Sequence, residues 1–162
     1  MIEELNLVKA IDFAIETEKL GQHVYSRLAK HFSDDKDLSE VFSSLAEDEK
    51  HHAEAFEKLR DKAGSMELNF EQKQYLRAIS LSDVWSGEDA PNKQIEGIKT
   101  REDALERAFK LERTTLAYYQ AIKEVVKDEI IDQMIAEEKG HLLKVMEYMV
   151  TGAKYRGLGD KY

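Results

Sequence analysis

The stretch LAEDEKHHAEAF at residues 45–56 has a counterpart in MIAEEKGHLLKV at residues 134–145. Both contain Glu-x-x-His, as Glu49 to His52 and as Glu138 to His141. In a helix, residues three apart share a face, so each Glu stands beside its His. Apolar residues at helical spacing continue that face on either side, so we expect it to be buried. Four ionisable groups in a core need a compensating partner, and a metal ion is the obvious one.

A second pair of segments extends the repeat. AIETEKLGQHVYSRLA at residues 14–29 aligns with AFKLERTTLAYYQAIK at residues 108–123. The alignment pairs Glu18 with Glu112 and Tyr25 with Tyr119, and each Glu interrupts an apolar stripe. An internal duplication of a helical hairpin predicts a four-helix bundle with pseudo-two-fold symmetry.

Hydrophobic periodicity predicts an all-α fold with four long helices. We expect the first from about Glu4 to Phe32 and the second to end near Gly64. The third begins at Thr100, and the fourth follows a break near Lys127-Asp128 and closes at Gly152. Residues 65–100 form a long crossover connection, with a short helix from Asn69 to about Ser80. The bundle is predicted to span residues 1–152, and residues 153–162 a C-terminal tail without helical period.

Three helix starts carry capping signals. Thr100 with Asp103 fits a capping box, and Asn69 with Gln72 fits a similar cap. For the second long helix Asp37 with Glu40 fits, but Ser33 or Asp34 could equally be the cap. Trp85 in the crossover is expected to anchor the loop or a subunit contact.

Composition excludes several classes of protein. The 162 residues contain no cysteine, so disulfides, thiolate zinc sites and iron–sulfur clusters are excluded. The formal net charge of -9 disfavours nucleic acid and anionic membranes as partners. No apolar run approaches the roughly 18 residues that a membrane span needs. The acidic N-terminal stretch is unlike a signal peptide, so we expect a cytoplasmic protein.

In the predicted bundle, the first and third helices each bring one Glu, and the second and fourth each bring Glu-x-x-His. Four carboxylates and two imidazoles facing inward match the ligand pattern of di-iron and di-manganese carboxylate proteins. Four carboxylates balance the charge of two divalent ions, and bridging carboxylates hold such ions close together. Oxygen and nitrogen ligands without thiolate suit iron or manganese.

At these residues the chain resembles the ferritin-like superfamily, and within it the rubrerythrin-type di-iron domain. The repeated A-x-x-x-E-[KR]-x-x-x-x-x-Y segments and both E-x-x-H motifs carry the resemblance over about residues 5–150. The resemblance implies a ferritin-like four-helix bundle that holds two Fe ions per chain, with Mn as the alternative. It leaves open which carboxylates bridge the metals. The implied metal ligands and catalytic residues are Glu18, Glu49, His52, Glu112, Glu138 and His141.

Two departures from the rubrerythrin pattern stand out. Rubrerythrins usually carry a rubredoxin-like domain with four cysteines, whereas this sequence has none, so a separate electron-donor protein is expected. Rubrerythrins also carry an extra Glu three residues after the third-helix ligand. That position is Thr115 here, which implies a six-ligand site and weakens the expectation of a rubrerythrin-type peroxidase.

The resemblance implies a redox protein that reacts with H₂O₂ or O₂ and protects against oxidative stress. The alternative is an iron-binding, ferroxidase or iron-storage protein, which requires a hollow multimer. A structural bundle with a degenerate site is a third class. The resemblance and the long crossover suggest a homodimer.

Other polar and aromatic residues receive simpler interpretations. Tyr25 and Tyr119 are expected to be core residues, with a contact to a ligand Glu as the less favoured alternative. Asp48 and His51 are placed on a face turned away from the site. His23 and His31 are expected at the surface.

Overall fold

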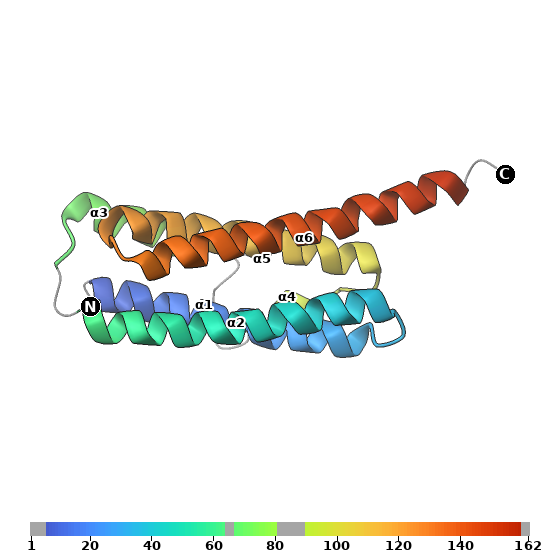
Figure 1. Cartoon of the computed structure of the whole chain (residues 1–162), viewed down its shortest axis with the longest axis horizontal. Helices are drawn as coiled ribbons and strands as arrows, with labels where there is room; N and C mark the ends of the chain where they lie inside the picture. Colours follow the sequence, from blue (N-terminus) through green and yellow to red (C-terminus); the bar gives the residue numbers. More distant parts are fainter. Residues whose placement is uncertain (1–5, 64–66, 81–89, 160–162) are drawn as a thin grey trace.

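The structure is a computed structural model that describes residues 6–63, 67–80 and 90–159. All regular structure in this part of the chain is helical, which confirms the predicted fold class. Two antiparallel hairpins pack face to face as the two layers of a bundle (Figure 1). The helices are α1 (Leu7–His31), α2 (Lys36–Ala63), α3 (Phe70–Ser80), α4 (Ala90–Ile95), α5 (Arg101–Val125) and α6 (Glu129–Gly159).

The hairpins are α1 with α2 and α5 with α6, and the chain passes between them through a long crossover. Figure 1 shows α2 and α5 running in the same direction, so the crossover returns along the length of the bundle. The helix α3 lies against α5 and α4 lies against α1. The helix α4 was not predicted, because Pro91-Asn92 indicated a turn, yet proline is compatible with the first turn of a helix. Trp85 lies outside the described residues.

Helix starts follow the predicted caps in two of three cases. Thr100 and Asp103 form the capping box of α5. Asn69 and Gln72 exchange hydrogen bonds of 2.9 and 3.0 Å at the start of α3. The predicted caps of α2 are wrong, because Asp35 accepts the backbone N–H of Leu38 at 3.1 Å and α2 begins at Lys36. Several acidic residues stand in this loop, and local chemistry alone does not distinguish them.

The last helix is longer than predicted. Gly152 was expected to end it, but α6 continues to Gly159 and extends beyond the other helices of the bundle in Figure 1. Glycine ends a helix efficiently when it adopts a positive φ. Among the described residues only Gly97 has one (77°), so Gly152 keeps a helical backbone. The predicted stop of α2, Gly64, lies outside the described residues.

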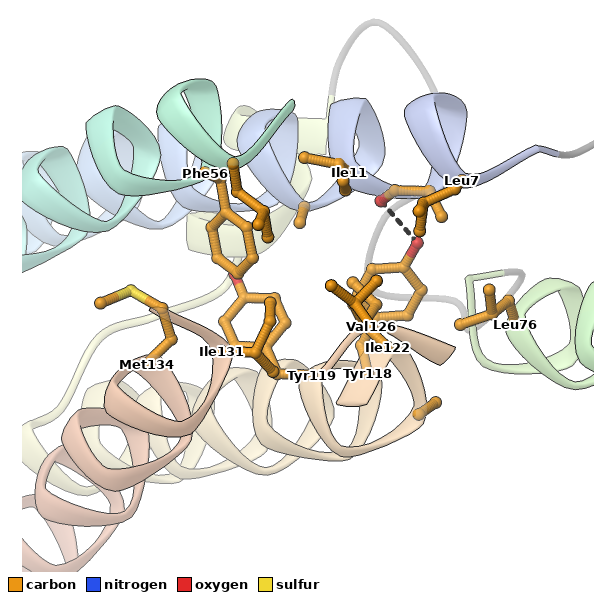
Figure 2. Close-up of a cluster of buried hydrophobic side chains, with 14 of the residues drawn as sticks. Leu7, Ile11, Phe56, Leu76, Tyr118, Tyr119, Ile122, Val126, Ile131 and Met134 are labelled. Carbon is orange, nitrogen blue, oxygen red and sulfur yellow. Dashed lines mark hydrogen bonds between the residues drawn. The ribbon is translucent and has the colours of Figure 1, made fainter. Parts of the chain in front are cut away.

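Two apolar clusters fill the bundle, one towards each end. The first joins the start of α1 to the ends of α2 and α5 and the start of α6, and Figure 2 shows Phe56, Tyr119 and Ile131 packed within it. The second joins the opposite ends and includes Leu28, Phe42 and Leu105. The middle of the bundle is left for polar side chains. No helix in the described ranges combines the length and apolarity that would let it cross a membrane.

Candidate metal centre

The structure brings all six predicted ligands together in the layer between the apolar clusters. Each lies several turns inside its helix, and α1, α2, α5 and α6 all contribute. All six side chains are buried among apolar neighbours that follow the same helical stripe. The exposed fractions of the whole residues are Glu18 1%, Glu49 4%, His52 1%, Glu112 1%, Glu138 0% and His141 7%.

One half of the site is centred on His52. Its Nδ1 atom lies 3.4 Å from Glu18 Oε2, 3.5 Å from Glu49 Oε2 and 2.8 Å from Glu138 Oε1. These carboxylates come from α1, α2 and α6, so three helices converge on one imidazole nitrogen.

The other half is centred on His141. Its Nδ1 atom lies 3.5 Å from Glu112 Oε2, 3.8 Å from Glu138 Oε2 and 4.0 Å from Glu49 Oε1. Glu49 and Glu138 therefore each present one oxygen to each histidine, whereas Glu18 faces His52 and Glu112 faces His141. One donor atom from each of Glu49, His52, Glu138 and His141 can be chosen so that all four lie within 4.8 Å of one another.

Six buried side-chain atoms of this cluster lack hydrogen-bond partners. Buried polar atoms without a partner are costly and are rare in folded proteins. Within the described ranges, every side-chain atom of this kind belongs to five of the six predicted ligands. These atoms are Glu18 Oε2, His52 Nδ1, Glu112 Oε2, both carboxylate oxygens of Glu138, and His141 Nδ1.

Burial and mutual repulsion perturb the carboxylates. Burial raises the pKa of Glu18 to about 7, although hydrogen bonding to Glu49 opposes the shift. Burial also raises the pKa of Glu49 and Glu138 well above the usual range, and repulsion from neighbouring carboxylates adds to it. Without a cation, several of these groups must hold protons at neutral pH. A divalent ion would replace those protons.

The pKa values of the two histidines and of Glu112 are shifted in the directions expected of groups that carry opposite charges and lie side by side. Burial lowers the pKa of His52, but the Glu138, Glu18 and Glu49 carboxylates outweigh it and the net pKa is raised. The pKa of His141 is raised in the same way, with burial opposed by Glu112. Burial raises the pKa of Glu112, yet the His141 partner lowers it overall.

Two tyrosines each donate a hydrogen bond to a carboxylate of the site on the facing helix. The Tyr25 hydroxyl on α1 donates to Glu112 on α5, and the Tyr119 hydroxyl on α5 donates to Glu18 on α1. Both are buried in the core as expected, and the less favoured alternative, a contact with a predicted ligand, holds as well. The sequence signal was the position of each Tyr seven residues after a Glu, which places the two on one helix face.

Replacing Tyr119 by phenylalanine should weaken metal binding without unfolding the protein. The hydroxyl holds Glu18 Oε1, which leaves Oε2 facing His52. Loss of such an orienting partner typically costs about 10- to 100-fold in metal affinity. Fe(II) or Co(II) titration of the anaerobic protein measures this loss.

The matched control is Tyr118→Phe. Tyr118 is equally buried in α5, but its hydroxyl donates to the Ala10 carbonyl at 2.8 Å, away from the cluster (Figure 2). It should lose about 1 kcal/mol of stability with metal affinity unchanged. Equal metal affinities for the two variants would contradict a role for Tyr119 at the site.

Sequence reasoning misplaced one acidic residue and did not consider another. Asp48 was assigned to a face away from the site, but its Oδ2 lies 3.3 Å from His141 Nε2 on the facing helix. Glu137 Oε2 lies 2.8 Å from His52 Nε2. The available signal was that both E-x-x-H motifs are directly preceded by an acid. The expected outward positions of His23, His31 and His51 are confirmed, because all three side chains are exposed.

One glycine makes room for the cluster. A Cβ atom on Gly21 would lie 3.2 Å from Glu49 Cδ, so this buried position in α1 keeps space for the Glu49 carboxylate. The equivalent position in α5 is Thr115, which is buried and brings no seventh carboxylate.

Fold and site together define a helical bundle with a buried Glu/His cluster that fits a di-iron centre. The family model of rubrerythrin matches residues 9–99, which is more than half of the chain. The chain therefore belongs to the rubrerythrin family. Comparison with curated proteins and with solved structures gave no match. The family match ends before α5, so Glu112, Glu138 and His141 are placed by the repeat and the geometry.

Proposed function

We propose that the protein is a di-iron oxidoreductase that reduces H₂O₂ or O₂ and thereby protects against oxidative damage. The observation that carries the proposal is the set of partnerless buried atoms on α1, α2, α5 and α6, which converge on one interior layer. Such a layer is costly without cations and is compensated when they bind.

The geometry suggests a role for each ligand. His52 with Glu18 would hold one ion and His141 with Glu112 the other. Glu49 and Glu138 would bridge, because each offers one oxygen to each side. Four carboxylates then balance two divalent cations. Two iron ions bound there would supply two electrons, the number that converts H₂O₂ and two protons into two water molecules.

The remaining side chains prepare the site for that reaction. Burial on all sides keeps bulk water away from the carboxylates. Tyr25 and Tyr119 keep hydroxyl protons beside Glu112 and Glu18, so the outer carboxylates are oriented before a cation arrives. We further propose that a separate protein returns the electrons, because the chain has no cysteine ligands for a second redox centre.

A ferroxidase or iron-storage role is the second candidate. The observation that favours it is Thr115, which stands where rubrerythrins have a further Glu, so the site offers six ligands. The two candidates differ in the oxidant and in how much iron is taken up.

Anaerobic Fe(II) titration followed by stopped-flow absorbance distinguishes them. We expect two iron ions per chain and faster oxidation by H₂O₂ than by O₂. Faster reaction with O₂, together with continued uptake beyond two ions, would replace the peroxidase proposal with ferroxidase and storage. A chain that binds no Fe(II) would refute both.

A further inference from the structure

The outward nitrogens of the two histidines meet carboxylates from the opposite hairpin. Glu137 on α6 reaches His52 on α2, and Asp48 on α2 reaches His141 on α6. Each acid directly precedes the Glu of its own E-x-x-H motif, so the two contacts are related by the pseudo-two-fold symmetry of the repeat. Neither acid belongs to the predicted ligand set.

These contacts differ from ordinary surface ion pairs. The His52 side chain is 1% exposed, whereas the Glu137 side chain is 42% exposed, so the pair connects the buried layer to the surface. The same holds for His141 at 9% and Asp48 at 44%. In each histidine Nδ1 faces the carboxylate cluster, which leaves Nε2 as the nitrogen that the outer acid contacts.

We propose that Glu137 and Asp48 are positioning residues of the metal centre. Each carboxylate accepts the Nε2–H of a histidine. When a cation displaces the proton on Nδ1, the remaining tautomer therefore has its Nδ1 lone pair pointing inward. A cation bound to that lone pair is then held by a ring that cannot rotate freely. The inference rests on the proposed metal site and adds two residues to it.

The crossing of the contacts gives them a second effect. The packing within each hairpin is much more extensive than the packing of α2 against α6. Because each acid lies on one hairpin and its histidine on the other, the two contacts hold α2 and α6 in register. They thereby set how far apart the two histidines stand.

The two contacts are unequal. Glu137 uses Oε2 for His52 while Oε1 accepts from Gln133 at 2.8 Å, so its carboxylate is fixed at both oxygens. The Asp48 contact is longer, at 3.3 Å against 2.8 Å. We therefore expect Glu137 to contribute more to metal affinity than Asp48, and its removal to weaken chiefly the binding of the ion beside His52.

Anaerobic Co(II) titration of the purified full chain tests the inference, because the visible bands of bound Co(II) report its ligand geometry. Glu137→Ala should lower the affinity for one of the two Co(II) ions by about 10- to 100-fold and alter the visible bands of that ion. Glu137→Gln keeps an acceptor oxygen and should restore part of the affinity. Asp48→Ala should give a smaller loss of affinity, and this loss should affect the ion beside His141.

Matched controls distinguish the loss of a histidine-positioning contact from the mere loss of a negative charge at the surface. Glu147→Gln on α6 and Asp61→Asn on α2 remove exposed carboxylates remote from the histidines and should leave both affinities unchanged. Wild-type affinity in Glu137→Ala, or an equal loss in Glu147→Gln, would overturn the inference while the metal site stands. A wild-type chain that binds no Co(II) or Fe(II) would overturn the proposed function itself. Circular dichroism confirms that each variant is folded.

Discussion

Glu138→Gln should abolish binding of the two metal ions and at the same time stabilise the metal-free protein at about pH 8. Glu138 is fully buried, and neither of its oxygens has a hydrogen-bond partner. Burial raises its pKa, and repulsion from Glu49 and Glu112 raises it further. Glutamine has the same shape, carries no charge and can donate to a neighbouring carboxylate. The substitution therefore removes a carboxylate that faces both histidines, which is the proposed bridging position, and it relieves a repulsion.

The stability effect should depend on pH with a definite sign. A carboxyl whose folded-state pKa is raised stabilises the fold fully below its unfolded pKa, and this contribution is lost as pH rises through the folded pKa. Glu18, with a pKa of about 7, behaves in the same way as Glu138. The metal-free wild type should thus be less stable at about pH 8 than at about pH 5. The gain from Glu138→Gln should be small at the lower pH and on the order of 1–3 kcal/mol at the higher pH.

Urea unfolding of the metal-free proteins at the two pH values, with Fe(II) titration alongside, measures both effects. Glu147→Gln, an exposed carboxylate on the same helix, is the control and should change neither quantity. Two tightly bound ions in Glu138→Gln would contradict the bridging role. A metal-free variant less stable than wild type at the higher pH would contradict the repulsion.

Metal binding should raise the midpoint of thermal unfolding of the wild type by about 10–20 °C. A ligand that binds only the folded state at about 100 times its Kd adds about 2.7 kcal/mol, so two ions add roughly 5 kcal/mol. For a chain of this size each kcal/mol moves the midpoint by about 2–4 °C. The physical reason is that the ions compensate buried groups that are partnerless or protonated in the metal-free fold.

Anaerobic calorimetry with Fe(II), followed by addition of a chelator, measures this shift and its reversal. Glu138→Gln serves as the matched control and should show at most a small shift. An Fe(II) shift of the same size in the variant would indicate binding elsewhere on this acidic protein. No shift in the wild type would indicate that the buried cluster holds no metal.

Helical periodicity accounts for most of what was predicted correctly. Spacings of three, four and seven residues are properties of a single helix, so they can be read from the chain. They placed Glu18, Glu49 and His52 on buried faces, and the repeat placed their counterparts. The cap of α5 was predicted for the same reason, because Thr100 and Asp103 are local partners.

Contacts between helices depend on the rotation and register with which the hairpins pack, which no single-helix spacing specifies. Packing makes Glu49 and Glu138, rather than Glu18 and Glu112, the carboxylates that face both histidines. It also brings Asp48 to a histidine across the bundle, although its own helix turns it away from the cluster. Which residues enter the core was thus a local property of the chain, and which of them meet there was a property of the assembled bundle.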